Sequence, residues 1–241
     1  MRIDRLLSNM GYGTRKEVKA YIKQGSVRLN GEVVKKVGEH VDVDRDVVTF
    51  LGEEVVYKEF VYYVMHKPQG VISATEDYVE HTVIDLLEDE DRHFEPFPVG
   101  RLDKDTEGLL LLTNDGQLAH RLLTPKNNVP KTYFAAIDQH VTDEDVAAFA
   151  QGVVLDDGYE TKPGELVVVS NEEDGTSRIE LTITEGKFHQ VKRMFQSVGK
   201  EVTYLKRLSM GPLVLDDVLT PLGTYRELSD DEVNALIAYV S

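Results

Sequence analysis

The 241-residue chain contains 27 Lys and Arg, 43 Asp and Glu and no cysteine, which gives a formal net charge of -16. Hydrophobic residues make up 41% of the chain, enough for a folded core, and the absence of cysteine excludes disulfides, thiolate zinc sites and thiol catalysis. The N-terminus does not have the apolar run of a secretory signal, and no segment approaches the roughly 20 apolar residues of a membrane helix, so we expect a cytoplasmic protein.

The charge is unevenly distributed along the chain. An overall negative charge argues against a nucleic-acid partner, because contacts with phosphates favour a basic surface. Residues 1–36, however, contain nine Lys and Arg against three Asp and Glu, whereas residues 76–95 contain nine acidic residues and one arginine. A local basic patch is sufficient to attract an anionic partner, so the first part of the chain remains a candidate nucleic-acid interface. We interpret the acidic segment as solvated surface.

Two short helices are predicted at the N-terminus. Asp4 is placed to cap the first, which Gly11 ends. Thr14 and Glu17 have the spacing of a capping box and predict the start of the second. The second helix presents a basic surface made of Arg15, Lys16, Lys19 and Lys23.

A hairpin is predicted directly after these helices. The stretch "SVRLNGEVV" alternates in hydrophobicity on both sides of an Asn-Gly pair, which is a strong hairpin signal. Two helices and a hairpin form a compact module, which we assign to residues 1–58. The rest of the chain, residues 59–241, is then a second and larger domain.

Residues 2–34, "RIDRLLSNMGYGTRKEVKAYIKQGSVRLNGEVV", resemble the S4 RNA-binding module. The helix caps, the glycines and the basic positions occur in the order typical of that module. The resemblance implies that RNA is held by Arg15, Lys16, Lys19, Lys23 and Arg28. The alternative is a basic helical surface that only keeps the domain soluble.

The larger domain mixes strands and helices. Strands are predicted at "FVYYVMH", "GLLLL", "KTYFAAI", "SRIELTIT" and "TYLKRLSM", and helices at "TVIDLLE", "QLAHRLL", "TDEDVAAFAQGV" and "HQVKRMFQSV". A capping box formed by Ser229 and Glu232 predicts a final helix. Because neighbouring segments often read as hairpins, we expect an α+β fold with a mixed or antiparallel sheet.

Four motifs adjoin predicted strands, where loops can converge on a cleft. They are "HKPQG" at 66–70, "GRLDKDTEGLLLLTNDG" at 100–116, "KTY" at 131–133 and "EGKFHQVKRMF" at 185–195. Asp103 in the second motif is either a turn residue or a reactive carboxylate, since a carboxylate can serve as nucleophile, acid or base. Lys192 and Arg193 are either the cations that keep it ionised or part of a solvated helix face. Tyr133 is either a core aromatic or a surface on which a base stacks.

Other types of site have little support in the sequence. The chain has no Walker-type loop, no GxGxxG after a strand and no GxSxG motif. His66 and His189 have no carboxylate or histidine at ligand spacing beside them, so we predict no metal site and interpret His189 as structural.

The four motifs, in this order, are similar to those of the RsuA/RluB/RluE/RluF family of pseudouridine synthases, which also often carries an S4-like module. The resemblance spans essentially the whole chain. It implies an isomerase that breaks the N-glycosidic bond of a uridine and rejoins the ribose to C5 of the same base, with no cofactor and no metal. It also implies that Asp103, Tyr133 and Lys192 are catalytic, and that the substrate RNA is contacted by Arg101, Lys187, Arg193 and Leu205.

The motifs also suggest a substrate. Their form is closer to that of enzymes acting on the small-subunit (16S) rRNA than to that of enzymes acting on the large-subunit (23S) rRNA. We therefore expect a 16S rRNA target, in free rRNA or in a pre-ribosomal particle, and a monomeric enzyme. The alternatives are a 23S enzyme of the same family, an S4-type RNA-binding protein without activity, and a hydrolase that uses Asp103 with Asp105.

Overall fold

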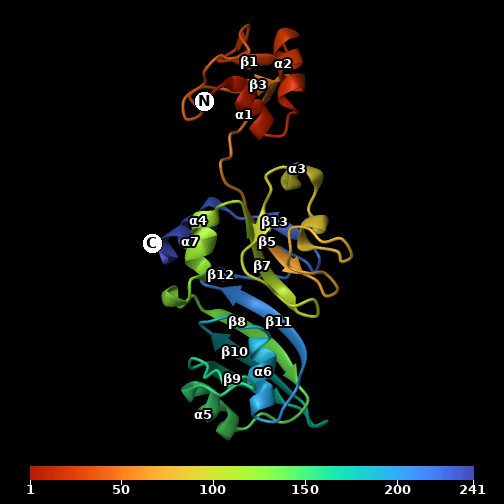
Figure 1. Ribbon diagram of the computed structural model, residues 1–241, viewed down its shortest axis with the longest axis vertical. Helices are drawn as coiled ribbons and strands as arrows, with labels where there is room; N and C mark the ends of the chain where they lie inside the picture. The colour runs from red at the N-terminus through yellow and green to blue at the C-terminus, as the bar shows by residue number, and fades with distance from the viewer. The chain divides into compact units, whose positions relative to one another are not determined.

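The computed structural model describes residues 1–241, and the chain divides into two compact units (Figure 1). The N-terminal unit consists of Met1–Val61 together with Glu88–Glu95, and the larger unit consists of Tyr62–Leu87 and Pro96–Ser241. The sequence patterns did not indicate that Glu88–Glu95, from the middle of the chain, groups with the first unit. None of the helices is long and apolar enough to cross a membrane.

The N-terminal unit combines helices with a four-stranded antiparallel sheet of order β2-β1-β3-β4. Its core is formed by apolar side chains such as Leu6, Val18 and Val27, which come from both helices and the sheet. The Asn-Gly turn joins β1 to β2 as predicted, and Asn30 and Gly31 both have positive φ. Its elements are α1 (Ile3–Asn9), α2 (Arg15–Lys23), β1 (Val27–Leu29), β2 (Glu32–Val33), β3 (Val48–Phe50), β4 (Glu53–Glu54) and α3 (Asp89–Arg92).

The two predicted helix starts have different outcomes. The capping box of α2 is confirmed, because the Thr14 amide donates to Glu17 Oε2 at 2.8 Å and the Glu17 amide donates to Thr14 Oγ1 at 3.3 Å. The prediction that Asp4 caps α1 is wrong: Arg2 occupies the N-cap position, and Asp4 lies in the first turn. The Asp4 carboxylate instead accepts two hydrogen bonds from the Arg2 guanidinium, at 3.0 and 2.9 Å.

The larger unit is built on a mixed sheet whose main path is β13-β5-β7-β11-β8-β10-β9. All strand pairs are antiparallel except β7 with β11, which confirms the predicted α+β class and mixed sheet. The sequence analysis did not predict β6, β9 or β13. The strands are β5 (Tyr62–Lys67), β6 (Phe97–Pro98), β7 (Glu107–Thr113), β8 (Lys131–Ile137), β9 (Glu165–Asn171), β10 (Ser177–Ile183), β11 (Val202–Met210), β12 (Leu213–Val214) and β13 (Tyr225–Glu227).

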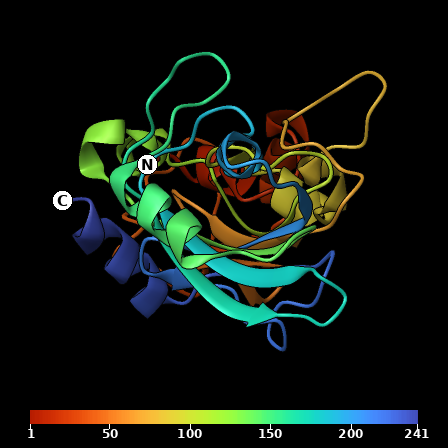
Figure 2. The same ribbon diagram turned by 90° about the horizontal axis from the view of Figure 1, so that it is seen from below.

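Helices cover this sheet at two places. The C-terminal helix α7 lies beside α4, and both pack into a core with Leu109 and Leu111 of β7 (Figure 1). Helices α5 and α6 lie on the same side of the sheet (Figure 2), and the rings of Phe149 and Phe195 join them with centroids 4.9 Å apart. The helices are η1 (Val83–Leu86), α4 (Gly116–Leu123), η2 (Pro125–Asn127), α5 (Asp143–Gln151), α6 (Gln190–Ser197) and α7 (Asp230–Tyr239).

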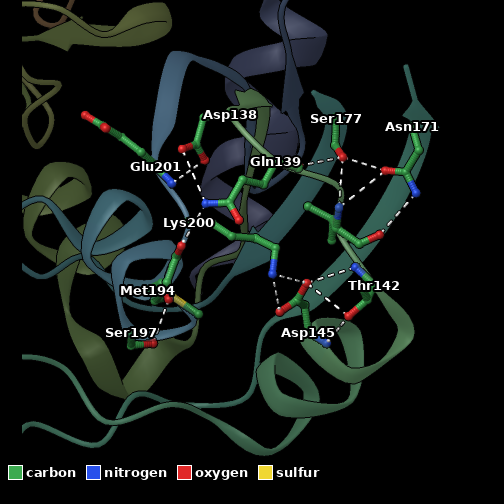
Figure 3. A network of polar contacts seen from close by, with 12 residues as sticks. Asp138, Gln139, Thr142, Asp145, Asn171, Ser177, Met194, Ser197, Lys200 and Glu201 are labelled. Atoms are coloured by element: carbon green, nitrogen blue, oxygen red, sulfur yellow. Dashed lines mark hydrogen bonds and ion pairs between the residues drawn. The ribbon is translucent and has the colours of Figure 1, made fainter. Parts of the chain in front are cut away.

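A network of polar contacts holds the segment that follows α6 (Figure 3). Lys200 Nζ lies 2.8 Å from Asp145 Oδ2 of α5, and both side chains are largely buried. Gln139 Nε2 donates to the Gly199 carbonyl at 3.0 Å, and the Glu201 amide donates to Asp138 Oδ1 at 2.7 Å. Burial alone would raise the pKa of Asp145, but hydrogen bonds from Lys200 and Thr142 outweigh it and hold that pKa below its usual range. The network therefore fixes the end of α6 to its neighbours.

The parallel contact between β7 and β11 depends on a glycine. Gly108 has φ +112°, and a Cβ at this position would overlap the backbone of Arg207 on β11. Only glycine allows so close an approach. The buried Arg207 side chain reinforces the pair, because its Nε donates to the Leu109 carbonyl at 2.7 Å. The loop that precedes β7, which carries Asp103, is thereby brought beside β11.

Candidate active site

Segments distant in sequence line one pocket of about 80 Å³ in the larger unit. The loop between β6 and β7, residues 99–106, is called here the Asp103 loop. Arg101 and Asp103 of this loop line the pocket together with Tyr133 of β8, Ile183 at the end of β10 and Leu205 of β11. Asp103 is the carboxylate that lines it. The pocket thus combines one acidic group with apolar and aromatic walls.

Two basic side chains lie close to the Asp103 carboxylate. Lys192 Nζ is 3.4 Å from Asp103 Oδ2, and His189 Nε2 is 3.5 Å from Asp103 Oδ1. The Asp103 side chain is 29% exposed, so a substrate entering the pocket can reach it. The structure therefore brings Asp103 and Lys192 together, as the sequence analysis predicted.

Lys192 also binds a second carboxylate more closely. Its Nζ donates to Asp105 Oδ1 at 2.6 Å and to Asp105 Oδ2 at 2.8 Å. This hydrogen bond is the main reason that the pKa of Asp105 lies below its usual range. Asp105 does not line the pocket, and both of its carboxylate oxygens bind Lys192. Asp105 instead anchors the ammonium group that faces Asp103.

Lys67 is bound to backbone carbonyls of the Asp103 loop, a contact that the sequence analysis missed. The side chain is fully buried, and its Nζ donates to the carbonyls of Pro68 at 2.9 Å, Asp103 at 3.0 Å and Thr106 at 3.0 Å. Burial lowers the pKa of Lys67 to about 8, so the group is largely protonated at neutral pH. The three N–H donors of an ammonium match these three carbonyls. The only sequence signal was its place in "HKPQG", at the end of an apolar strand.

His189 was interpreted as structural, but it faces the site. It occupies the N-cap of α6 in the left-handed conformation, with φ +48°. It lines the pocket and reaches Asp103, as given above. Its position directly before the predicted basic helix was the one signal in the sequence. No group of three or more His, Cys, Asp or Glu in the chain is arranged to hold a metal ion.

Of the other predicted site residues, four line the pocket and Arg193 does not. Tyr133 and Leu205 are almost completely buried and form walls of the pocket, while Arg101 and Lys187 line it from more exposed positions. Arg193 differs, because its guanidinium binds Asp156 and Asp157, with Nε 2.6 Å from Asp156 Oδ1 and Nη2 2.7 Å from Asp157 Oδ2. These hydrogen bonds raise the pKa of Arg193. The predicted contact between Arg193 and the substrate therefore has no support in this geometry.

The predicted RNA-binding residues of the N-terminal unit form an exposed basic surface. Four of them lie along α2 and the fifth lies on β1; they are Arg15, Lys16, Lys19, Lys23 and Arg28. Val18 and Ile22 form the buried face of α2, while the five basic side chains remain exposed. Arg28 Nη1 donates to the Gly31 carbonyl at 2.9 Å, which places its guanidinium beside the hairpin turn.

Comparison with known proteins agrees with this geometry. Residues 61–197 match the family model described as RNA pseudouridylate synthase, and residues 1–47 match that of the S4 domain. The chain is 57% identical to an uncharacterized RNA pseudouridine synthase of Bacillus subtilis over 98% of both chains. It is 38% identical to the ribosomal small subunit pseudouridine synthase A of Vibrio cholerae, over 98% of this chain and 99% of the relative.

A large-subunit enzyme and a solved structure are also similar to this chain. The ribosomal large subunit pseudouridine synthase B of Bacillus subtilis is also 38% identical, over 98% of this chain and 96% of the relative. A crystal structure of a pseudouridylate synthase superposes with a TM-score of 0.68 at 34% identity, over 98% of this chain and 99% of the other. The chain is therefore a pseudouridine synthase that belongs to the RsuA/RluB/RluE/RluF family and carries an S4 domain at its N-terminus.

Proposed function

We propose that this enzyme isomerises a specific uridine of 16S rRNA to pseudouridine, with Asp103 as the catalytic carboxylate. The observation that carries the proposal is the pocket that this carboxylate lines together with Tyr133 and Leu205, with Lys192 Nζ 3.4 Å from it. The ammonium group of Lys192 therefore faces the carboxylate that we propose to be reactive. An ionised carboxylate is the form that can attack carbon or accept a proton.

The reaction requires the uridine to leave the RNA stack, because its reacting atoms are otherwise out of reach. The flipped base would lie between the Tyr133 ring and the Leu205 side chain, within reach of Asp103. The bond between N1 and the ribose C1′ breaks, C1′ bonds to C5 of the same base, C5 loses its proton and N1 gains one. The reaction is therefore an isomerisation, in which the acid–base groups of the pocket take the proton from C5 and supply the one to N1. We assign attack or proton transfer to Asp103, and contact with the base to Tyr133.

The basic surface of the N-terminal unit supports RNA as the substrate. Exposed Lys and Arg bind phosphates, and RNA is recognised largely through its shape and its unpaired loops. We assign this task to Arg15, Lys16, Lys19, Lys23 and Arg28, and place the target in free rRNA or in a pre-ribosomal particle. We further propose that the enzyme is a cytoplasmic monomer.

The choice of 16S rRNA rests on the form of the motifs at the N-terminus and around Asp103. A 23S target is the second candidate, because the large-subunit relative is as similar to this chain as the small-subunit one. A binding protein without activity is disfavoured, since both Asp103 and Tyr133 are present and line the same pocket.

Tritium release tests the proposal directly. Unmodified 16S and 23S rRNA would be prepared with uridine labelled at C5 and incubated with the wild-type enzyme and the Asp103→Asn variant. Release from 16S alone, absent in the variant, supports the full proposal. Release from 23S alone would keep the reaction and replace the substrate. A wild-type enzyme that acts on neither rRNA should next be given pre-ribosomal particles, and inactivity there would refute the proposal.

A further inference from the structure

Phe188 is an exposed aromatic residue at the edge of the active site. It lies in the loop between β10 and α6, and 68% of its surface is exposed. Its ring stacks on that of His189, with centroids 3.7 Å apart and planes 21° from parallel. His189 covers one face of the Phe188 ring, so the exposed surface belongs to the opposite face and the edge. Burial in the protein does not explain why a large apolar ring occupies this position.

The stacked pair connects the catalytic pocket to a larger hollow beside it. His189 lines both spaces, whereas Phe188 lines only the outer one, which has a volume of about 540 Å³. Arg101, Lys187 and the Asp103 carboxylate also line both spaces, and Lys104 lines the outer one, so basic side chains outnumber the acidic one there. The outer hollow is therefore a cationic depression with an aromatic surface, open to solvent and continuous with the site of chemistry.

We propose that Phe188 is the stacking platform for a nucleobase that neighbours the target uridine in the RNA strand. The inference rests on the proposed function, because it takes the inner pocket as the place of the flipped uridine. An unpaired base has a π-face that stacks on aromatic side chains irrespective of its identity. Phosphates on either side of that base would lie near Arg101 and Lys187.

The backbone holds this platform in place before RNA binds. After Phe188, His189 is the N-cap of α6 and has a positive φ. Before Phe188, the Lys187 amide donates to Gln190 Oε1 at 2.8 Å. Gln190 Nε2 in turn donates to the buried Glu185 carboxylate at 2.7 Å. The loop is thus fixed on both sides of Phe188. A platform that is already ordered loses little conformational entropy when the base stacks on it.

The test compares four variants of the full-length enzyme. Phe188→Ala removes the ring, Phe188→Leu keeps an apolar side chain without a π-face, and Phe188→Tyr keeps the ring. Tyr239→Ala is the matched control, because Tyr239 is a partly exposed aromatic of α7 that lines neither space. Two quantities are measured: the affinity and fluorescence of a short single-stranded oligoribonucleotide containing 2-aminopurine, and kcat and KM for tritium release from the rRNA that the wild type accepts.

We expect Phe188→Ala and Phe188→Leu to weaken binding and raise KM by roughly tenfold or more, with kcat within about twofold of the wild type. Both should also lose the quenching of 2-aminopurine that stacking causes. Phe188→Tyr should restore both, and Tyr239→Ala should match the wild type. Equal affinity and KM in the wild type and the Ala and Leu variants would overturn the inference, and so would a loss confined to kcat. Failure of the wild type to release tritium would refute the proposed function. The oligoribonucleotide affinities of the variants test the stacking role of Phe188 independently of that result.

Discussion

The two basic regions of the molecule use their cations in opposite ways. On α2 the four basic side chains are exposed, whereas Val18 and Ile22 are buried. At the active site, Lys67 is fully buried on three carbonyls and Lys192 is bound to Asp105. Exposed cations are available to phosphates and are screened by salt, whereas buried ones are committed to the protein and fix its geometry. The same residue type is therefore exposed to solvent in one region and organises the Asp103 loop in the other.

Asp103→Asn would separate chemistry from binding most completely. The substitution is nearly isosteric but removes the charge, so we expect activity to fall by on the order of a thousandfold or more. RNA affinity and thermal stability should stay near wild-type values, because the exposed surface of α2 is untouched. Tritium release, RNA binding and Tm together check this. An active variant would refute the role of Asp103, and a variant that no longer binds RNA would show that the two regions are not independent.

Lys67→Met tests whether the buried cation organises the site. The change leaves carbonyls of the Asp103 loop without their donor, and we expect about 2–3 kcal/mol of lost stability together with reduced kcat. Lys104→Met is the matched control, because this lysine of the same loop is half-exposed and binds Glu80 at 2.6 Å. Urea denaturation and steady-state kinetics measure both effects. If the two variants behave alike, the contacts of Lys67 do not hold the loop.

Lys200→Met probes the ion pair near the end of α6 and has a defined pH dependence. Removing the cation strands the largely buried Asp145 carboxylate, and we expect a loss of about 2 kcal/mol at neutral pH. The folded protein holds the pKa of Asp145 below its ordinary 3.8, so this stabilisation is present above that pH and is lost as the pH falls through the lower, folded value. Denaturation from about pH 7 downward should therefore show the difference shrinking below about pH 4. A difference independent of pH would exclude the ion pair as its cause.

The double change Lys16→Glu with Lys19→Glu should have the smallest effect on the reaction itself. We expect RNA affinity to fall roughly tenfold and the dependence of affinity on salt to become shallower, because two phosphate contacts are lost. At saturating RNA, kcat should be unchanged, since neither residue belongs to the unit that holds the pocket. Affinity measured across a salt series provides the test. An unaltered slope would remove α2 from the RNA interface.

Local features of the fold were predictable because they depend on neighbouring residues. The capping boxes of α2 and α7 and the Asn-Gly turn of the N-terminal hairpin each form within a few residues of chain. β9 was missed although "ELVVVSN" contains three consecutive valines. Burial does alternate along this edge strand, but the apolar Val167 and Val169 occupy exposed positions, so the sequence does not alternate between apolar and polar residues.

The family motifs were likewise identifiable, because Asp103, Tyr133 and Lys192, which we propose to be catalytic, lie in long and specific stretches of sequence. Their arrangement was not. The pairing of Lys192 with Asp105, the position of His189 beside Asp103 and the binding of Arg193 to Asp156 all join residues that are distant in the sequence or lie on different elements. No periodicity in the chain encodes which of several nearby carboxylates a cation will reach.

By itself, the sequence determined the two-part organisation, the fold class and the family, since these depend on local patterns and on motifs read in order. Only the tertiary structure decided which charged side chains contact one another, such as Lys192 with Asp105 and Arg193 with Asp156. The parallel contact of β7 with β11, allowed by Gly108, places the Asp103 loop beside the strand that bears Leu205. Burial then makes Lys67 a structural ammonium, while the lysines of α2 remain exposed. The physical reason is that desolvation and long-range pairing are properties of the packed chain, which no stretch of sequence carries alone.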